Sequence, residues 1–284
     1  MLRSTLNSLA GQTDVNLSAF EVLIVDNNCT DHTADVVDLF RESLPIRRIT
    51  ETRQGLAHAR NRAATECRGD VVIFTDDDIR FEPGWLAAYE DAIHRFPDAD
   101  YFGGRILPDW RQAKPRWIRD RALPLIGGVL GWFDHGTETR PVQTIEQMPW
   151  GASFAIRRRL FEKIGLFRTD LGTGGSGLGR GEETEFFMRA KRAAARGVYV
   201  GEALCLHAYD PKRLKLAALY RHGIACGRSH NAIVPRPHCG TYRAAGWFVL
   251  RGLYQLVKGR GDRFRQCVIN AGIEVGTRSD YVRR

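Results

Sequence analysis

Three consecutive carboxylates close a buried apolar segment of this sequence and are its strongest candidates for chemistry. Asp76, Asp77 and Asp78 follow the run 71–75, whose apolar and β-branched residues predict a strand. The carboxyl end of a strand in an α/β sheet is a common place for ligands. Asp76 and Asp78 point the same way on an extended segment, so together they can present oxygens to one divalent cation. Mg²⁺ and Mn²⁺ prefer such ligands and often share them with phosphates, whereas a solvated acidic turn is the alternative that these residues alone leave open.

The segments around this acidic run alternate between strand and helix patterns, which predicts an α/β fold with a mostly parallel sheet and helices on both faces. We expect strands at 20–25, 46–50, 71–74, 101–107, 151–156 and 198–200, and helices at 2–9, 31–40, 55–67, 83–94, 157–164 and 182–195. Residues 109–149 show little periodicity, so we interpret them as a long, irregular excursion. The glycine-rich stretch 172–181 predicts a loop, and basic helical patterns follow from 212 to 271.

Composition narrows the class of protein. The chain has 284 residues, of which 43% are hydrophobic and 26% charged, as in a globular protein with a substantial core. Its net charge of +9 suits an anionic partner, namely nucleic acid, anionic lipid or a phosphorylated substrate. There is no DNA- or RNA-binding motif, so we expect no nucleic-acid partner. Scattered cysteines, the lack of a long apolar run and the lack of a signal-peptide pattern predict a cytoplasmic protein with free thiols.

Five segments together resemble the family 2 nucleotide-sugar glycosyltransferases of the GT-A fold, and they do so in the expected order: 23–31, 55–63, 72–86, 151–167 and 181–191. The resemblance implies a Rossmann-like sheet with flanking helices. It also implies an inverting, metal-dependent transfer of a sugar from a UDP- or GDP-sugar to a glycan or lipid-linked acceptor, as in cell-envelope polysaccharide or glycolipid synthesis.

The resemblance also implies a domain organisation. Residues 1–230 would form the GT-A domain, with a nucleotide-binding half at 1–108 and an acceptor-binding half at 109–230. Residues 231–284 would form a C-terminal helical extension, with apolar residues at helical spacing and basic residues among them. Such a segment can lie on an anionic membrane, which would make the protein peripheral at the inner face of the cell membrane; packing against the catalytic domain is the alternative that we prefer.

On the donor side, the resemblance assigns roles to residues at two strand ends. Asp26 would accept a hydrogen bond from the nucleotide base, with Asn27 beside it, unless Asp26 only caps a turn. Asp78 would contact Mg²⁺ or Mn²⁺ most directly. Asp76 would hold the ribose or a metal-bound water, and Asp77 lies between them in the motif. The cation would neutralise charge on the departing diphosphate.

Three further residues match positions that carry chemistry in this family. Glu183 would be the general base that deprotonates the acceptor hydroxyl, although the family usually has Asp here. Alternatively, it and Glu182 complement the dipole of a helix. Arg60 would reach the diphosphate, unless it forms a surface ion pair. His207 would ligate the metal, unless it is structural.

The sequence departs from the family at its start, because the family normally has a strand before the first helix and this sequence begins at the helix. A start assigned too far downstream is the explanation that we favour, and a degenerate, inactive protein is the other. The alternative functions are a nucleotidyltransferase and a catalytically degenerate nucleotide-sugar-binding protein. A dehydrogenase is not expected, since no Gly-x-Gly-x-x-Gly follows a strand.

Overall fold

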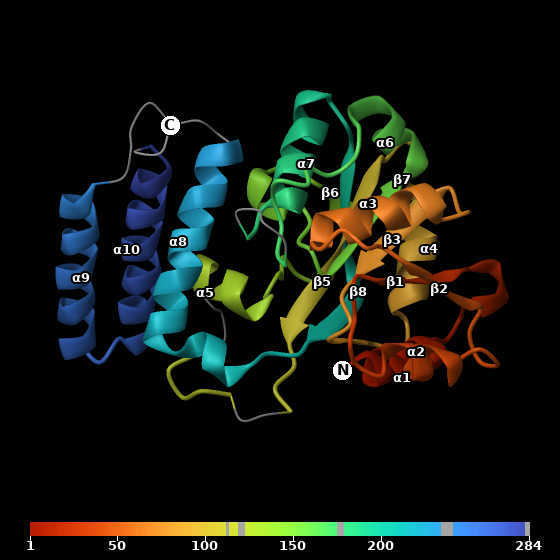
Figure 1. Ribbon diagram of the computed structural model, residues 1–284, viewed down its shortest axis with the longest axis horizontal. Helices are drawn as coiled ribbons and strands as arrows, with labels where there is room; N and C mark the ends of the chain where they lie inside the picture. Colours follow the sequence, from red (N-terminus) through yellow and green to blue (C-terminus); the bar gives the residue numbers. More distant parts are fainter. Residues whose placement is uncertain (112–113, 119–122, 175–178, 234–240, 282–284) are drawn as a thin grey trace. The chain divides into compact units, whose positions relative to one another are not determined.

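The computed structural model describes residues 1–111, 114–118, 123–174, 179–233 and 241–281 (Figure 1). The chain divides into two compact units. The first comprises Met1–Leu107, Phe133–Gly177 and Glu182–Ala208, and the second comprises Pro108–Trp132, Leu178–Gly181 and Tyr209–Arg284. Within the second unit, the helix Leu216–Ile233 packs along the helix Gly261–Tyr281.

The first unit contains two sheets. In the smaller, β1 (Val22–Asp26) pairs in parallel with β2 (Ile46–Thr50). The larger has six strands in the order β3-β7-β5-β8-β4, with β6 also paired to β8. Its strands are β3 (Val71–Thr75), β4 (Ile79–Phe81), β5 (Tyr101–Pro108), β6 (Arg140–Pro141), β7 (Ser153–Arg157) and β8 (Gly197–His207).

The direction of the strands corrects the expectation of a mostly parallel sheet. Strand β7 pairs antiparallel with both β3 and β5, and β8 pairs antiparallel with β4 and β6. Strands β3 and β5 therefore run the same way, as the strand–helix alternation predicts. The chain enters β7 from the opposite end because it first passes through the excursion after β5. The α/β class is confirmed, but the sheet is mixed.

Helices cover both faces of the larger sheet. One face packs on α4 (Trp85–Arg95), whose buried residues include Trp85, Leu86 and Tyr89. The other packs on α3 (Leu56–Glu66), α6 (Arg158–Ile164) and α7 (Glu182–Arg192). Helices α1 (Leu2–Ala10) and α2 (Thr33–Asp38) form a third apolar cluster with β2. Short 3-10 turns lie at Leu17–Ala19, Ile145–Gln147 and Pro211–Leu214.

The centre of the sheet is closely packed around Ser153 on β7. Its hydroxyl receives a hydrogen bond from the Trp85 indole at 3.1 Å and lies 2.9 Å from the Tyr89 hydroxyl. A Cβ on Gly104 of β5 would lie 2.4 Å from the Ser153 hydroxyl and 2.6 Å from that of Tyr89. Glycine is therefore required at position 104 by close approach rather than by backbone conformation.

The second unit is helical and consists of α5 (Pro124–Leu130), α8 (Leu216–Ile233), α9 (Tyr242–Val257) and α10 (Gly261–Tyr281). Helix α10 packs against both α8 and α9 (Figure 1). Helices α8 and α10 approach closely through glycines, since a Cβ on Gly223 would lie 2.1 Å from the Ile269 carbonyl oxygen. No helix within the described ranges has the length and hydropathy that crossing a membrane requires.

Candidate active site

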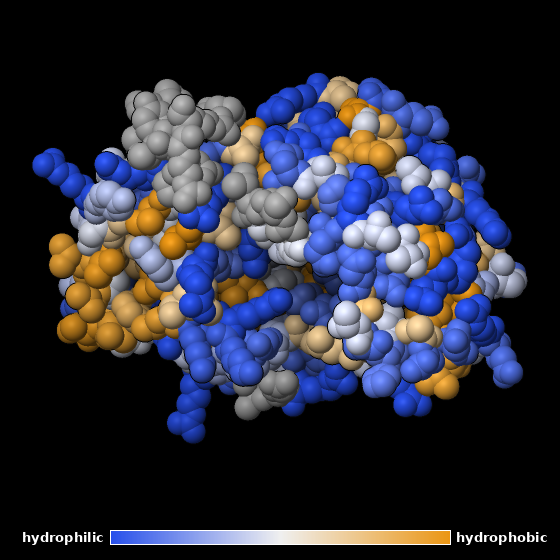
Figure 2. All heavy atoms as spheres, in the orientation of Figure 1, coloured by the Kyte–Doolittle hydropathy of each residue, from blue (hydrophilic) through white to orange (hydrophobic). Residues whose placement is uncertain are grey.

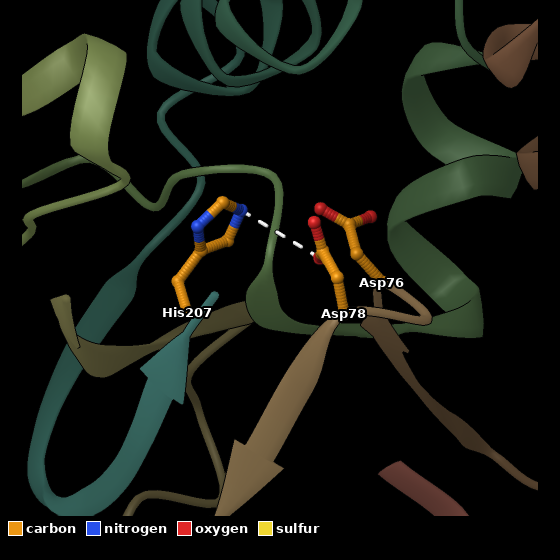
Figure 3. A group of neighbouring side chains, drawn as sticks. All are labelled: Asp76, Asp78 and His207. Carbon is orange, nitrogen blue, oxygen red and sulfur yellow. Dashed lines mark ion pairs between the residues drawn. The ribbon is translucent and has the colours of Figure 1, made fainter. Parts of the chain in front are cut away.

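Three potential ligand groups meet where β3 and β8 end and β4 begins. Asp76 and Asp78 lie in the short link between β3 and β4, and His207 is the last residue of β8. The antiparallel register places His207 opposite Ile79, and the Ala208 amide donates to the Asp78 carbonyl oxygen at 3.0 Å. One ligand atom from each of Asp76, Asp78 and His207 lies within 4.8 Å of the others (Figure 3).

The electrostatics of this cluster favour a cation. Burial raises the pKa of Asp76 to about 6; Arg60 opposes the shift, and Asp78 and Glu183 add to it. The Asp78 Oδ1 atom is buried and has no hydrogen bond within the described residues, although His207 Nε2 lies 3.7 Å away. The cluster offers two carboxylates and an imidazole, and the Asp78 carboxylate has a buried oxygen without a hydrogen bond within the described residues. Such a set of groups suits a divalent ion that takes oxygen and nitrogen ligands.

Asp77 lies between these two ligands but is exposed. Its carbonyl oxygen accepts a hydrogen bond from the Thr5 hydroxyl of α1 at 2.7 Å, and this bond holds the β3–β4 link against α1. Partial burial, followed by the Asp78 charge, raises the pKa of Asp77. The structure thus separates the three neighbouring carboxylates, with the first and last in the cluster and the middle one at the surface.

The acidic residues at the start of α7 lie beside this cluster. Helix α7 carries Glu182, Glu183 and Glu185 in its first turn and three basic residues in its last turn, an order that complements the helix dipole. The Glu182 side chain is 3% exposed, whereas that of Glu183 is 23% exposed. Burial, followed by the neighbouring Glu183 charge, raises the pKa of Glu182. Glu183 is therefore the more accessible of the two carboxylates.

The Arg60 guanidinium links α7 to the metal-ligand cluster. Its Nη1 donates to Glu182 Oε1 at 2.6 Å and lies 3.9 Å from Glu183 Oε2. Its Nη2 lies 3.7 Å from Asp76 Oδ1 and donates to the Gly151 carbonyl oxygen at 3.0 Å. The guanidinium also lies over the Phe154 ring, 5.3 Å from its centroid. One buried cation therefore holds both Asp76 and Glu183 within 4 Å.

This internal role of Arg60 was not expected from the sequence, although α3 carries a signal for it. Ala57, Arg60 and Ala64 are the buried residues of α3, at spacings of three and four that define one helix face. An arginine in line with two buried alanines indicates an internal ion pair. Its neighbour Asn61 exchanges two hydrogen bonds with the Phe167 backbone, each 2.9 Å long.

Asp26 and Asn27 form a second polar group at the end of β1. Asp26 Oδ1 accepts from the Cys29 amide at 2.9 Å, and Oδ2 accepts from Arg48 at 2.6 Å. The amide hydrogen bond, partly offset by burial, lowers the pKa of Asp26. Asn27 donates to the carbonyl oxygens of Glu51 and Arg53 and accepts from the Gly55 amide, each at 2.8 Å. Asn27 therefore joins the end of β1 to the segment that leads into α3.

Part of the glycine-rich stretch 172–181 lies outside the described residues. The described part begins against the site, because the Leu56 amide donates to the Thr173 carbonyl oxygen at 2.9 Å. Gly172 has φ +96°, and a Cβ there would lie 3.3 Å from Glu182 Oε2. The chain thus passes close to the buried carboxylate just before it reaches residues 175–178.

A family model matches the part of the chain that contains several of these residues. Glycosyl transferase family 2 matches residues 1–165, which include Asp26, Arg60 and the acidic link between β3 and β4. The chain belongs to glycosyl transferase family 2. The predicted resemblance to this family is thereby confirmed.

This family 2 chain is also similar to individual proteins. It is 26% identical to a glucosyl-dolichyl phosphate glucuronosyltransferase of Haloferax volcanii over 211 residues, which cover 72% of the chain and 63% of that relative. The chain thus spans less than two thirds of the length of this curated relative.

Two solved structures share the fold. The mannosyltransferase PcManGT from Pyrobaculum calidifontis, in complex with GDP-Man and Mn²⁺, matches with a TM-score of 0.63 and 18% identity, over 99% of this chain and 83% of its own. TarS of S. aureus in complex with UDP-GlcNAc matches with a TM-score of 0.54 and 15% identity, over 99% of this chain and 88% of its own. The predicted GT-A fold is confirmed by these matches.

Proposed function

We propose that this chain transfers a sugar, with inversion, from a nucleoside-diphosphate sugar to a hydroxyl acceptor and that the reaction depends on Mg²⁺ or Mn²⁺. The observation that carries the proposal is the shared guanidinium of Arg60. It lies within 4 Å of both Asp76 and Glu183, so the metal-ligand cluster and the accessible carboxylate belong to one site. A donor held at the first and an acceptor deprotonated at the second would meet there.

Asp76, Asp78 and His207 would hold the metal. These residues fit a metal ion because the buried Asp78 Oδ1 atom lacks a hydrogen bond within the described residues and lies among other oxygen and nitrogen atoms that can act as ligands. When bound, the cation supplies positive charge to the diphosphate leaving group. Asp76 and Asp78 would set the position of the cation through the short β3–β4 link, and the pairing of β8 with β4 fixes the place of His207.

Glu183 would act as the general base. As the acceptor oxygen bonds to the anomeric carbon, the bond from that carbon to the diphosphate breaks and Glu183 takes the hydroxyl proton. Attack opposite the leaving group inverts the anomeric centre, through a sugar with oxocarbenium character. Glu182 is buried against Arg60, so it would position the base rather than exchange the proton itself.

Asp26 and Asn27 would bind the nucleotide, with Asp77 at the exposed edge of the same donor site. The bound ligands in the two structural neighbours, GDP-Man and UDP-GlcNAc, support a GDP- or UDP-sugar as the donor. The name of the Haloferax volcanii relative specifies glucosyl-dolichyl phosphate, which supports a lipid-linked acceptor in glycolipid or polysaccharide synthesis.

The test combines binding and turnover. Thermal unfolding with UDP and GDP, with and without Mn²⁺, should reveal stabilisation that needs both nucleotide and metal. At a ligand concentration of about 100 times the dissociation constant, such binding adds about 2.7 kcal/mol. Asp78→Asn should abolish this stabilisation, whereas Asp70→Asn, an exposed residue immediately before β3, should keep it.

The second measurement is nucleotide release from a panel of UDP- and GDP-sugars. Glu183→Gln should keep donor binding and lower turnover by about 10²–10⁴-fold, as the loss of a general base does. Glu162→Gln, on the exposed side of α6, is the matched control. Donor binding without turnover in the wild type would instead support a nucleotide-sugar-binding protein, and wild-type turnover by Glu183→Gln would contradict the assigned base.

A further inference from the structure

Helix α9 presents its large apolar side chains to solvent. These residues are each between 49% and 85% exposed: Tyr242, Trp247, Val249, Leu250, Leu253, Tyr254, Leu256 and Val257. Figure 2 shows the apolar side chains gathered over this helix. We call these eight residues the α9 face. A contiguous apolar surface of this kind on a folded unit marks an interaction site.

The side of α9 that packs on α10 is small or polar. Its buried residues are Ala245, Gly252 and Gln255, and the buried Gln255 Oε1 has no hydrogen bond within the described residues. Gly252 is the point of closest approach, because a Cβ there would lie 3.1 Å from the Phe264 ring and 3.2 Å from Cys267 Cβ. A helix in water normally buries its large apolar residues and exposes its polar ones. The reversed pattern of α9 indicates that its outer face is adapted to an apolar medium.

Cations accompany this face. Helix α9 contains Arg243 and Arg251 and no acidic residue, and Lys258 caps its end. The Arg251 guanidinium lies 5.0 Å from the Trp247 ring centroid, and Lys258 Nζ lies 5.7 Å from that of Tyr254. Long basic side chains beside interfacial aromatics can place their apolar stems along a membrane while their charges reach lipid phosphates.

We infer that α9 lies in the plane of a membrane surface that contains anionic lipids, with the α9 face buried at the boundary between headgroups and acyl chains. Its 16 residues give a length of about 24 Å at 1.5 Å per residue, which suits a helix lying in the interface. A second copy of the chain fits less well. Pairing two α9 faces would bring arginines and lysines together with no carboxylate on either helix to balance them. This inference does not depend on the proposed transfer reaction.

The experiment is flotation of the full chain with vesicles of phosphatidylcholine alone or with 30% phosphatidylglycerol. The wild type should float with the anionic vesicles and lose most of this binding at high salt. Leu250→Gln/Val257→Gln should lower partitioning about a hundredfold, because burying each aliphatic side chain contributes about tenfold or more. Leu39→Gln is the matched control, since Leu39, immediately after α2, is 62% exposed and lies outside the α9 face.

A second measurement locates the contact independently of these variants. Vesicles with brominated acyl chains should quench tryptophan fluorescence in the wild type, and Trp247→Phe should lose most of that quenching. Two results would overturn the inference. One is the absence of binding to anionic vesicles at low salt. The other is a concentration-dependent dimer, detected by light scattering, that Leu250→Gln/Val257→Gln converts to monomer while no protein binds vesicles.

Discussion

Replacing Arg60 with methionine tests whether one buried cation holds the active site together. Methionine keeps an unbranched side chain of similar reach against Phe154 but removes the guanidinium from Glu182. Both members of this pair are nearly inaccessible, with side-chain exposures of 6% and 3%. Removing one partner of such a pair leaves the other charge buried without compensation.

The size of the loss follows from two contributions. The hydrogen bond from Arg60 to the Gly151 carbonyl oxygen is charge-assisted, and its loss costs about 1.5–3 kcal/mol. The second contribution depends on pH, because Glu182 can escape its unpaired charge by taking up a proton. Burial and the neighbouring Glu183 charge already raise the folded-state pKa of Glu182, so the cost of neutralising this side chain grows as pH rises. We therefore expect Arg60→Met to lose about 3–5 kcal/mol at pH 8, as breaking a buried ion pair does, and less at pH 6.

The assay is urea-induced unfolding followed by circular dichroism at both pH values. Arg62→Met is the matched control on the same helix. Arg62 pairs with Glu66 at 3.1 Å, with exposures of 43% and 37%, so its loss should be below about 1 kcal/mol. A loss for Arg60→Met as small as that of the control, or a larger loss at pH 6 than at pH 8, would refute the reasoning.

Three further predictions follow from single residues. Asp76→Asn should stabilise the metal-free protein above pH 6 and remove the stabilisation by Mn²⁺. Burial raises the folded-state pKa of Asp76 from 3.8 to about 6, so the wild-type protein loses stability as pH rises through that range. Glu51→Gln should flatten the acid limb of the stability profile, because hydrogen bonds from Arg53 lower the pKa of Glu51 from 4.5 to about 2 and its contribution is lost as pH falls through that interval. Denaturation across pH checks both. Gly104→Ala should lower the free energy of unfolding by about 1–3 kcal/mol, because its Cβ would clash with Ser153 and Tyr89, whereas Gly84→Ala meets open space and serves as the control.

Periodicity in the sequence was sufficient to predict the alternating elements of the first unit. Helices such as α4 and strands such as β3 carry their burial pattern in the local sequence, so their positions agree with the expectation to within a few residues. Strand β4 was missed because three residues after an acidic run give no period to detect. Helix α5 was missed for a different reason: its seven residues are almost entirely apolar, and they lie within a segment that otherwise lacks regular patterning.

The metal-ligand cluster could be predicted from the sequence more fully than the buried ion pair of Arg60. Asp76 and Asp78 are close along the chain, and the resemblance to the family predicts a histidine near them, at His207. The partner of Arg60 is separated from it by 122 residues, and the sequence offers several carboxylates that could fill that role. In the structure Arg60 pairs with Glu182, and the chain just before β7 brings the Gly151 carbonyl oxygen to the same guanidinium. Strand direction was one part of the fold that the sequence mispredicted, and the arrangement of charges around Arg60 could emerge from the three-dimensional structure alone.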